Sequence, residues 1–239
     1  MSRRAERRAV RLGVVALFAL AALSPAWGAS RAVEDSIAQR MQACTVCHGR
    51  EGRATPDGYF PRIAGKPAGY LYNQLVNFRE GRRHYAPMAY LVEHLSDAYL
   101  REIAAYFATL ELPYAPPQAL QAPAATLAAG ERLVRQGDAA RQLPACTRCH
   151  GERMSGAEPS LPGLVGLPRD YLLAQLGAWR SGQRRAAAPD CMATIVQRLQ
   201  PEEIEALASW LAAQQPPAAG TPAVRVSAPL PLDCGSALR

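Results

Sequence analysis

The sequence predicts an all-α protein made of two tandem copies of one helical domain. One observation behind this prediction is an ordered set of motifs that recurs at a period of about 100 residues. The other is that apolar residues between the motifs follow helical spacing, whereas no stretch alternates well enough to predict a strand. At 239 residues, with 49% hydrophobic and 20% charged residues, the chain has the length and composition of one or two ordinary globular domains.

Matching motifs occur in the same order in both copies. Each copy contains Cys-x-x-Cys-His-Gly, then Pro-x-x-x-Gly, then Tyr-Leu-x-x-Gln-Leu, then a methionine that precedes an amphipathic stretch. The period is too long for the stacked units of a solenoid, so we interpret the copies as domains. We expect five segments: a signal peptide at 1–28, a first domain at 29–111, a Pro-rich linker at 112–125, a second domain at 126–215 and a Pro-rich C-terminal tail at 216–239.

Residues 1–28 have the features of a secretory signal. Five arginines form a basic start, residues 12–23 form an apolar stretch, and Ala26 and Gly28 provide a small-residue cleavage site. Twelve apolar residues are few for a membrane span, although an uncleaved anchor helix is the alternative. Cleavage reduces the formal charge from +7 to about +3, which gives little support for a nucleic-acid partner. We therefore expect a periplasmic protein.

The first copy contains three expected helices. Residues 33–43 lead into the first Cys motif, and residues 70–80 form a second helix. The third is the best marked, because Ser96 is a good N-cap residue. Its apolar positions then share one face: Leu100, Ile103, Ala104 and Phe107.

The second copy repeats these three helices. Thr126 is expected to cap a helix over 127–136 that Gly137 ends, and residues 171–181 form the next helix. Pro201 is expected to open the last helix, since proline is favoured at the first helical position. The apolar stripe of that helix is Ile204, Leu207, Ala208 and Leu211.

The Cys-x-x-Cys-His motif is the signature of c-type haem attachment. Two thiols one turn apart add to the two vinyl groups of the porphyrin, and the adjacent histidine reaches the iron. The sequence thus predicts two covalently bound haem c groups, attached through Cys44 and Cys47 and through Cys146 and Cys149, with iron ligands His48 and His150. A zinc site formed by the four cysteines and thioredoxin-type redox chemistry are the alternatives. The long separation of the pairs and the lack of a βαβ pattern disfavour both.

A sixth iron ligand has to come from outside these motifs. Met88 lies 40 residues after His48, and Met192 lies 42 residues after His150. A thioether ligand fills the coordination site and raises the reduction potential of the iron. His84 competes with Met88 in the first copy, but the second copy has no histidine in the corresponding region.

Two other methionines and one other histidine are not our candidates for the sixth iron ligand. Met41 and Met154 lie too close to the Cys motifs to reach the opposite haem face, so we interpret them as packing residues. His94 lies at the start of the third expected helix.

The ordered motifs resemble those of class I cytochrome c, and their duplication resembles the dihaem cytochrome c4 family. The resemblance covers roughly residues 31–214. It implies two helical haem domains related by a pseudo-two-fold axis, with haem propionates near the interface. It also implies that the carbonyls of Pro61 and Pro162 accept hydrogen bonds from the proximal histidines. The segment Pro189-Asp-Cys-Met192 departs from the simple Pro-Met pattern, as does the tail.

The expected function is that of an electron carrier without catalytic residues, acting between respiratory-chain partners. The family implies a quinol-oxidising complex upstream and a membrane terminal oxidase or a reductase downstream, with peripheral membrane association allowed. A dihaem peroxidase-like enzyme and the dedicated cytochrome subunit of a dehydrogenase complex are the alternatives. Two methionine ligands would argue against the open iron site that a peroxidase needs.

Two cysteines lie outside the haem motifs, and four of the arginines form two adjacent pairs that lie opposite one another in the repeat. Cys191 and Cys234 are an even pair in an oxidising compartment, so we expect a disulfide that closes a loop of about 44 residues. Free thiols, or ligation of iron by Cys191, are the alternatives. The four arginines occupy equivalent places in the repeat and either neutralise haem propionates or form a solvated face: Arg82, Arg83, Arg184 and Arg185.

Overall fold

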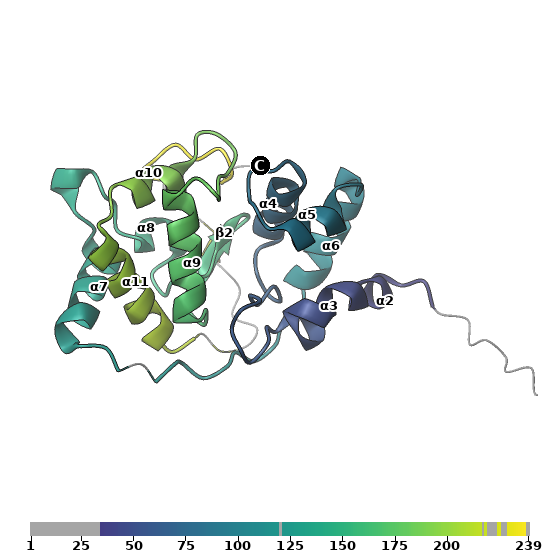
Figure 1. The fold of residues 1–239 in the computed structure, drawn as a ribbon, viewed down its shortest axis with the longest axis horizontal. Helices are drawn as coiled ribbons and strands as arrows, with labels where there is room; N and C mark the ends of the chain where they lie inside the picture. Colours follow the sequence, from purple (N-terminus) through teal and green to yellow (C-terminus); the bar gives the residue numbers. More distant parts are fainter. Residues whose placement is uncertain (1–33, 120, 217, 219–223, 226–228, 238–239) are drawn as a thin grey trace, which may run out of the picture. The chain divides into compact units, whose positions relative to one another are not determined.

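The computed structural model describes residues 34–119, 121–216, 218, 224–225 and 229–237. These residues form a mostly helical structure, which confirms the all-α prediction (Figure 1). The signal peptide expected at 1–28 and the first residue of the helix expected at 33–43 lie outside the described residues. None of the helices in the described part of the chain has the length and apolar character that crossing a bilayer requires.

The first half, residues 34–111, places the predicted apolar face inside. It runs through α2 (Ile37–Arg40), α3 (Gln42–His48), the 3-10 turn η1 (Arg50–Gly52), α4 (Ala68–Arg79), α5 (Ala86–Val92) and α6 (Asp97–Ala108). Helix α4 packs on both α5 and α6. Ser96 caps α6, because its Oγ accepts a hydrogen bond from the Tyr99 N–H. The expected face of α6 is buried in the first core, together with Leu71 and Phe78 of α4.

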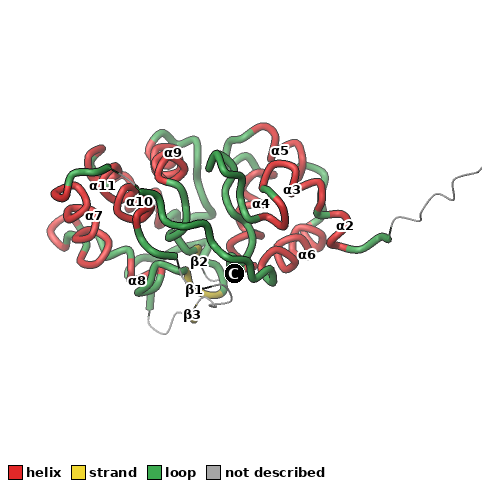
Figure 2. The backbone as a smooth tube through the Cα atoms, turned by 90° about the horizontal axis from the view of Figure 1, so that it is seen from below, coloured by secondary structure: helices red, strands yellow, loops and turns green. Residues whose placement is uncertain are grey.

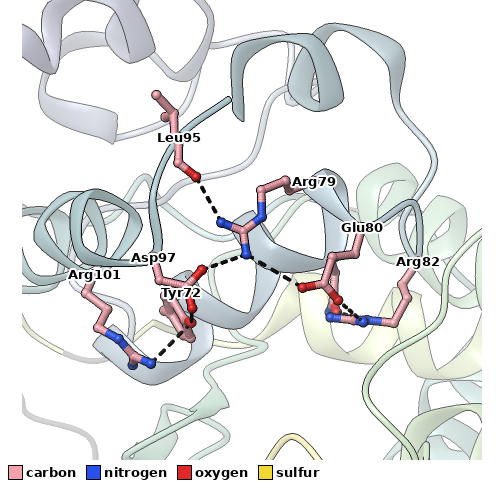
Figure 3. A network of polar contacts seen from close by, with 8 residues as sticks. Tyr72, Arg79, Glu80, Arg82, Leu95, Asp97 and Arg101 are labelled. Atoms are coloured by element: carbon pink, nitrogen blue, oxygen red, sulfur yellow. Dashed lines mark hydrogen bonds and ion pairs between the residues drawn. The ribbon is translucent and has the colours of Figure 1, made fainter. Parts of the chain in front are cut away.

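Surface polar groups fasten α4 to the start of α6 (Figure 3). Arg79 contacts Asp97 at 2.6 Å and donates to the carbonyl of Leu95 at 2.9 Å. Tyr72 donates to the same aspartate at 3.0 Å. Exposed pairs of this kind stabilise only weakly, at about 0 to 1 kcal/mol each. Their effect here is to orient α4, whose far face meets the second half.

The second half, residues 124–216, repeats the helical order around its own core. It contains α7 (Ala124–Gln136), η2 (Ala139–Arg141), α8 (Thr147–His150), β1 (Gly156–Glu158), β2 (Leu161–Pro162), α9 (Arg169–Arg180), α10 (Cys191–Gln197) and α11 (Pro201–Ala213). Helix α11 packs on α7 and α9. Gly130 allows the close approach of α7 and α11, since a Cβ there would lie 2.2 Å from the Ala206 carbonyl oxygen. Pro201 opens α11 as predicted.

One expected helix start is wrong, and one expected helix is divided. Helix α7 begins at Ala124 after Pro123, so Thr126 lies inside the helix rather than capping it. The alanines at 124 and 125 favour helix, and the residue before a proline is biased away from helical geometry. The helix expected over 33–43 is divided, because α2 ends at Arg40 and α3 begins at Gln42.

A small three-stranded sheet corrects the expectation of no strands (Figure 2). Strand β1 pairs antiparallel with β2 and parallel with β3 (Val224–Arg225), which belongs to the C-terminal tail. These strands have two or three residues each. Such short strands cannot show a period of two in the sequence, and their pairing is long-range.

The loop that follows α4 pairs with the loop that follows α9, its counterpart in the repeat. The His84 N–H donates to the carbonyl of Gln183 at 2.9 Å, and the Arg185 N–H donates to the carbonyl of Arg82 at 2.7 Å. Between these two bonds, Arg83 and Arg184 form an isolated antiparallel bridge. Equivalent residues thus face one another where the two halves meet.

The linker and the tail are both tied to the folded halves. Arg62 donates to the linker carbonyls of Leu112 and Pro113 at 2.6 and 2.9 Å. In the tail, Cys234 is joined to Cys191 by a disulfide. The Ser160 hydroxyl donates to the carbonyl of Ala237 at 2.8 Å. The tail is therefore fastened onto the second half beside α10.

Candidate functional site

The first Cys-x-x-Cys-His motif occupies helix α3. Its helical spacing brings Cys44, Cys47 and His48 to one side of the helix. Both thiols are free of disulfides. Burial raises the pKa of Cys44, and the neighbouring Cys47 raises it further. Two unpaired sulfurs with an adjacent histidine are the donor set that haem attachment needs.

A backbone carbonyl fixes the orientation of the His48 ring. The side chain is 9% exposed, and its Nδ1 lies 2.9 Å from the carbonyl oxygen of Pro61. A carbonyl only accepts hydrogen bonds, so Nδ1 carries the proton and Nε2 keeps its lone pair. Burial lowers the pKa of His48, which also favours the neutral ring. His48 is thus prepared to bind a metal ion through Nε2.

The second motif repeats this arrangement at α8. His150 is 6% exposed, and its Nδ1 donates to the carbonyl of Pro162 at 2.8 Å. Burial lowers the pKa of His150, as it does in the first half. The adjacent Cys146 thiol has its pKa raised to about 11 by burial. Both halves therefore present the same set of groups.

The glycine that follows each histidine has a structural reason. Gly49 has φ of 73° and Gly151 has φ of 80°, in the region that favours glycine. A Cβ on Gly49 would lie 2.2 Å from the Ala54 carbonyl oxygen. The chain can turn sharply after the histidine only because no side chain is present there.

The two candidate methionine ligands lie in short helices that the sequence did not reveal. Met88 is in α5, and Met192 is in α10. Each is partly buried against the core that its own Cys motif also borders. The structure thus places a thioether and a thiol on the same core in each half. Iron ligation by Met88 and Met192 stays a prediction.

Among the described residues, the other two methionines are buried and the other two histidines are exposed. Met41 and Met154 are 2% and 1% exposed and belong to the two cores, which supports their interpretation as packing residues. The side chain of His94 is 90% exposed on the surface. His84 is exposed, and its backbone pairs with the other half.

A cluster of polar side chains lies between the halves, close to both sites. Arg83 donates to Gln74 and Gln175 at 3.0 and 2.7 Å, and to the hydroxyl of Tyr171 at 3.1 Å. Arg184 donates to the same two glutamines at 3.0 and 2.8 Å. Every acceptor is a neutral oxygen. We call these residues, with Tyr70, the arginine cluster: Tyr70, Gln74, Arg83, Tyr171, Gln175 and Arg184.

The arginine cluster holds more positive charge than its described neighbours offset. Arg184 is 5% exposed, and burial and the nearby Arg83 both lower its pKa. No carboxylate of the described residues forms an ion pair with either guanidinium. Beside them the Nε1 of Trp179 is buried and has no hydrogen-bond partner in the described part of the chain. An added carboxylate group would offset the positive charge of the arginines and could accept a hydrogen bond from the Trp179 N–H. The cluster therefore fits haem propionates.

The other two arginines of this set belong to the solvated face. Arg82 pairs with Glu80 and donates to Asn77, as Figure 3 shows for the ion pair. Arg185 is exposed. Of the four arginines, Arg83 and Arg184 thus belong to the arginine cluster, and Arg82 and Arg185 do not.

The zinc alternative finds no support in the geometry. The two cysteine pairs border two different cores. Across the described residues, no group of three or more His, Cys, Asp or Glu side chains is arranged to hold a metal ion. The residues present fit two haem groups rather than one shared ion.

Sequence reasoning missed most of the arginine cluster and all of Lys66. The repeated Tyr-Leu-x-x-Gln-Leu run was the available signal, because Tyr70 and Gln74 and their counterparts lie one helical turn apart on a shared face. Lys66 is 7% exposed and reaches the second half. Nothing in the sequence distinguishes it from a surface lysine.

Comparison with known proteins gives consistent matches. Residues 125–211 match the family described as cytochrome C oxidase, cbb3-type, subunit III. The chain is 36% identical over 198 residues to the thiosulfate dehydrogenase electron acceptor of Thiomonas intermedia (strain K12), covering 83% of this chain and 90% of the relative. It is 34% identical over 188 residues to cytochrome c4 of Pseudomonas aeruginosa, covering 77% and 90%.

A solved structure agrees with these relatives. The chain matches reduced recombinant cytochrome c4 from Pseudomonas stutzeri with a TM-score of 0.62 and 31% identity. The match covers 73% of this chain and 94% of that chain. The likeness therefore extends over nearly the whole of a solved protein and is not restricted to one helical motif.

Proposed function

We propose that this chain, which belongs to the dihaem cytochrome c4 family, transfers electrons in the periplasm for a dehydrogenase that oxidises an inorganic sulfur compound. As a member of that family, it carries two covalently bound haem c groups and is an electron-transfer protein. When bound, each haem c supplies an iron that cycles between the ferrous and ferric states. The remaining chemistry belongs to the residues of this chain.

The observation that carries the electron-carrier function is the matched pair of oriented histidines. His48 and His150 each donate a hydrogen bond from Nδ1 to a proline carbonyl. This bond fixes the orientation of the ring, with Nε2 on the opposite side from the carbonyl. A ligand that stays fixed through both oxidation states keeps the reorganisation of the site small. The chain thus supports repeated electron transfer without making or breaking a substrate bond.

We propose Met88 and Met192 as the sixth ligands. Their equivalent places in α5 and α10, against the cores that the Cys motifs border, support this assignment. A methionine in each sixth position fills the site that a peroxidase would leave open to peroxide. The test is carbon monoxide binding to the reduced protein: slow or no binding is expected, and rapid binding at one haem would support the enzyme alternative.

The proposed periplasmic location rests on two features. Residues 1–28 resemble a secretory signal, and the Cys191–Cys234 disulfide suits an oxidising compartment. Cell fractionation of the haem-stained protein is the direct test. Recovery of the mature, shortened protein in the periplasmic fraction is expected, and retention of the full chain in the membrane fraction would indicate an anchor instead.

The Thiomonas relative supports the proposed donor, because its name states that it accepts electrons from a thiosulfate dehydrogenase. This favours the dedicated partner of a dehydrogenase over a general carrier. A quinol-oxidising complex remains the second candidate donor, as the family resemblance implies. Downstream, we propose a membrane terminal oxidase or a periplasmic reductase as the acceptor. Contacts with each partner are expected to be small and brief.

The donor is tested by mixing the ferric protein with thiosulfate and a catalytic amount of purified thiosulfate dehydrogenase. We expect the absorption bands of both reduced haems to appear at a rate proportional to the dehydrogenase concentration. Thiosulfate alone is the control. Reduction no faster than this control would contradict the proposed donor. Rapid reduction by a purified quinol-oxidising complex would then identify that complex as the donor.

A further inference from the structure

Lys66 is the only lysine in the chain, and it crosses from the first half into the second. It lies two residues before α4 and is 7% exposed. Its Nζ donates a hydrogen bond of 3.2 Å to the carbonyl of Gly163, which directly follows β2. A buried ammonium group from one half is therefore fixed inside the other.

The lysine is held next to the proximal side of the second site. Gly163 follows Pro162, whose carbonyl accepts the hydrogen bond from His150. Lys66 and His150 thus bind neighbouring carbonyls of the same short segment. The ammonium group of Lys66 is therefore held close to the proximal side of His150.

The charge of Lys66 is poorly compensated. It forms no ion pair with a carboxylate among the described residues. Burial lowers the pKa of Lys66, and the nearby Arg62 lowers it further, whereas the nearby Tyr70 raises it. Burial opposes ionisation of Tyr70, but Arg184, Arg83 and Lys66 hold the pKa of its phenol below the ordinary value. Charges act more strongly in a buried environment than in water, because the effective dielectric constant is lower.

The repeat shows that this charge acts on one half only. The position equivalent to Lys66 is Leu167, which is 7% exposed and neutral. The charge that acts on His48 comes from Arg83, a member of the shared arginine cluster. Lys66 therefore breaks the electrostatic symmetry of two otherwise matching sites.

We propose that Lys66 of the first half raises the reduction potential of the second haem. Ferric iron carries one more positive charge than ferrous iron, so a fixed cation beside His150 favours the ferrous state. The electron that reduces the iron comes from the donor, and Lys66 changes only the equilibrium. The inference rests on iron binding by His150, and it does not depend on which dehydrogenase is the donor.

The test is a spectroelectrochemical titration of Lys66→Met, Lys66→Gln and Lys66→Arg, with each haem followed by its own methyl resonances in NMR spectra. Lys66→Gln keeps a donor for Gly163 but removes the charge. At a fixed applied potential, both neutral variants are expected to lower the ratio of reduced to oxidised second haem about tenfold, equal to about 59 mV for one electron. Lys66→Arg is expected to recover most of that loss, and the matched control Leu167→Met should change neither haem.

Two results would overturn the proposal. One is a Lys66→Gln protein whose second haem titrates as the parent does, which would show that the charge has no effect. The other is an equal shift of both haems, which would indicate a general change in the interface. In both cases the electrons come from an electrode. The titration therefore tests the role of Lys66 even if the dehydrogenase does not reduce this protein.

Because the chain has one lysine, its charge is directly measurable. A protein grown with lysine labelled at Cε with ¹³C should give a single resonance from this side chain. At pH 7 we expect the chemical shift of an ammonium, with an added shift when the second haem is oxidised. The chemical shift of a neutral amine would also refute the proposal.

Discussion

His48 and His150 each donate the Nδ1 proton to a proline carbonyl, at 2.9 and 2.8 Å. That bond decides the tautomer, and the tautomer decides which nitrogen binds iron. In each half the acceptor is the backbone carbonyl of a proline, which can only accept. At this scale the site is therefore organised by the backbone as much as by side chains.

The assignment of Met88 is tested by Met88→His. Replacing sulfur by nitrogen is expected to lower the potential of the first haem and to remove roughly half of the weak far-red charge-transfer band that Met-ligated ferric haem shows. Optical spectra of the oxidised protein and a redox titration measure both effects. His84→Ala is the control, and a control that loses the band while Met88→Leu keeps it would identify His84 as the ligand.

The arginine cluster gives a second prediction at this scale. Arg184→Gln removes the buried one of two guanidiniums that lack a described carboxylate partner. If propionates supply the missing negative charge, the variant should lower the potential of at least one haem, since unpaired negative charge then favours ferric iron. The measurement is a redox titration that gives the potentials of both haems, with Arg185→Gln, a substitution of the exposed neighbour, as the control. Equal potentials in the two variants would contradict a contact with propionate.

At the residue scale the motif spacing predicted the haem-attachment residues, whereas the hydrogen-bond partners of Arg83 and Arg184 and the burial of Lys66 were not predicted. The motif spacing is local, so Cys44, Cys47 and His48 are recognisable within five residues. The arginine cluster and Lys66 depend on contacts between residues about 100 positions apart. The repeated Tyr-Leu-x-x-Gln-Leu run is a local signal for the cluster, but no local pattern distinguishes Lys66.

The start of α11 shows how an element is held in place. The Glu203 side chain accepts from the backbone N–H of Gln200 at 2.8 Å and contacts Arg141 at 2.7 Å. The first bond is half of a capping box, and the second ties α11 to the turn η2. Carboxylates are favoured in a first helical turn, and here one of them also joins two elements.

Glu203→Gln is expected to lower the free energy of unfolding by about 1 kcal/mol. The hydrogen bond from Arg141 holds the pKa of Glu203 below its ordinary value of 4.5. Its stabilisation is therefore present above pH 4.5 and is lost as the pH falls through the lowered pKa.

Urea unfolding at several pH values, followed by circular dichroism, measures this difference. The gap between the parent protein and Glu203→Gln should narrow as the pH falls from 4.5 through the lowered pKa of Glu203. Glu202→Gln, an exposed neighbour in the same turn, is the control. A gap that stays constant down to pH 2 would show that the charge of Glu203 contributes nothing.

Among the elements, long amphipathic helices were predictable and short segments were not. Helices α6 and α11 have 12 and 13 residues, enough for apolar residues to repeat on one face. Helices α5 and α10 have seven residues each, fewer than the pattern needs. The strands β1 and β3 pair across more than 60 residues, so their existence depends on tertiary contacts.

In the molecule as a whole, the C-terminal tail acts as a strap on the second half. Its disulfide joins residues 43 apart in sequence, and one of them, Cys191, begins the helix that carries Met192. The Asn73 side chain of α4 also donates to the carbonyl of Ser236 at 2.8 Å. The strap thus touches both halves, beside the helix that carries a proposed iron ligand.

Replacing both cysteines by serine is expected to lower the free energy of unfolding by about 3 to 4 kcal/mol, from the loss of loop closure. Denaturant unfolding measures this loss, and non-reducing peptide mapping should find Cys191 joined to Cys234 in the parent protein. The haem spectrum of Cys191→Ser is the control and should equal that of the parent. Two alkylatable thiols in the protein as isolated would contradict the pairing.

The central claim is that one chain carries two covalently bound haems, each with a histidine and a methionine on iron. An optical redox titration of the purified mature protein, combined with its intact mass, tests this most directly. We expect a mass that exceeds the polypeptide by two haem groups, two one-electron steps per chain, and a far-red sulfur-to-iron band in the oxidised state. A single-electron titration, or a colourless zinc-containing protein from cells able to attach haem, would contradict the claim.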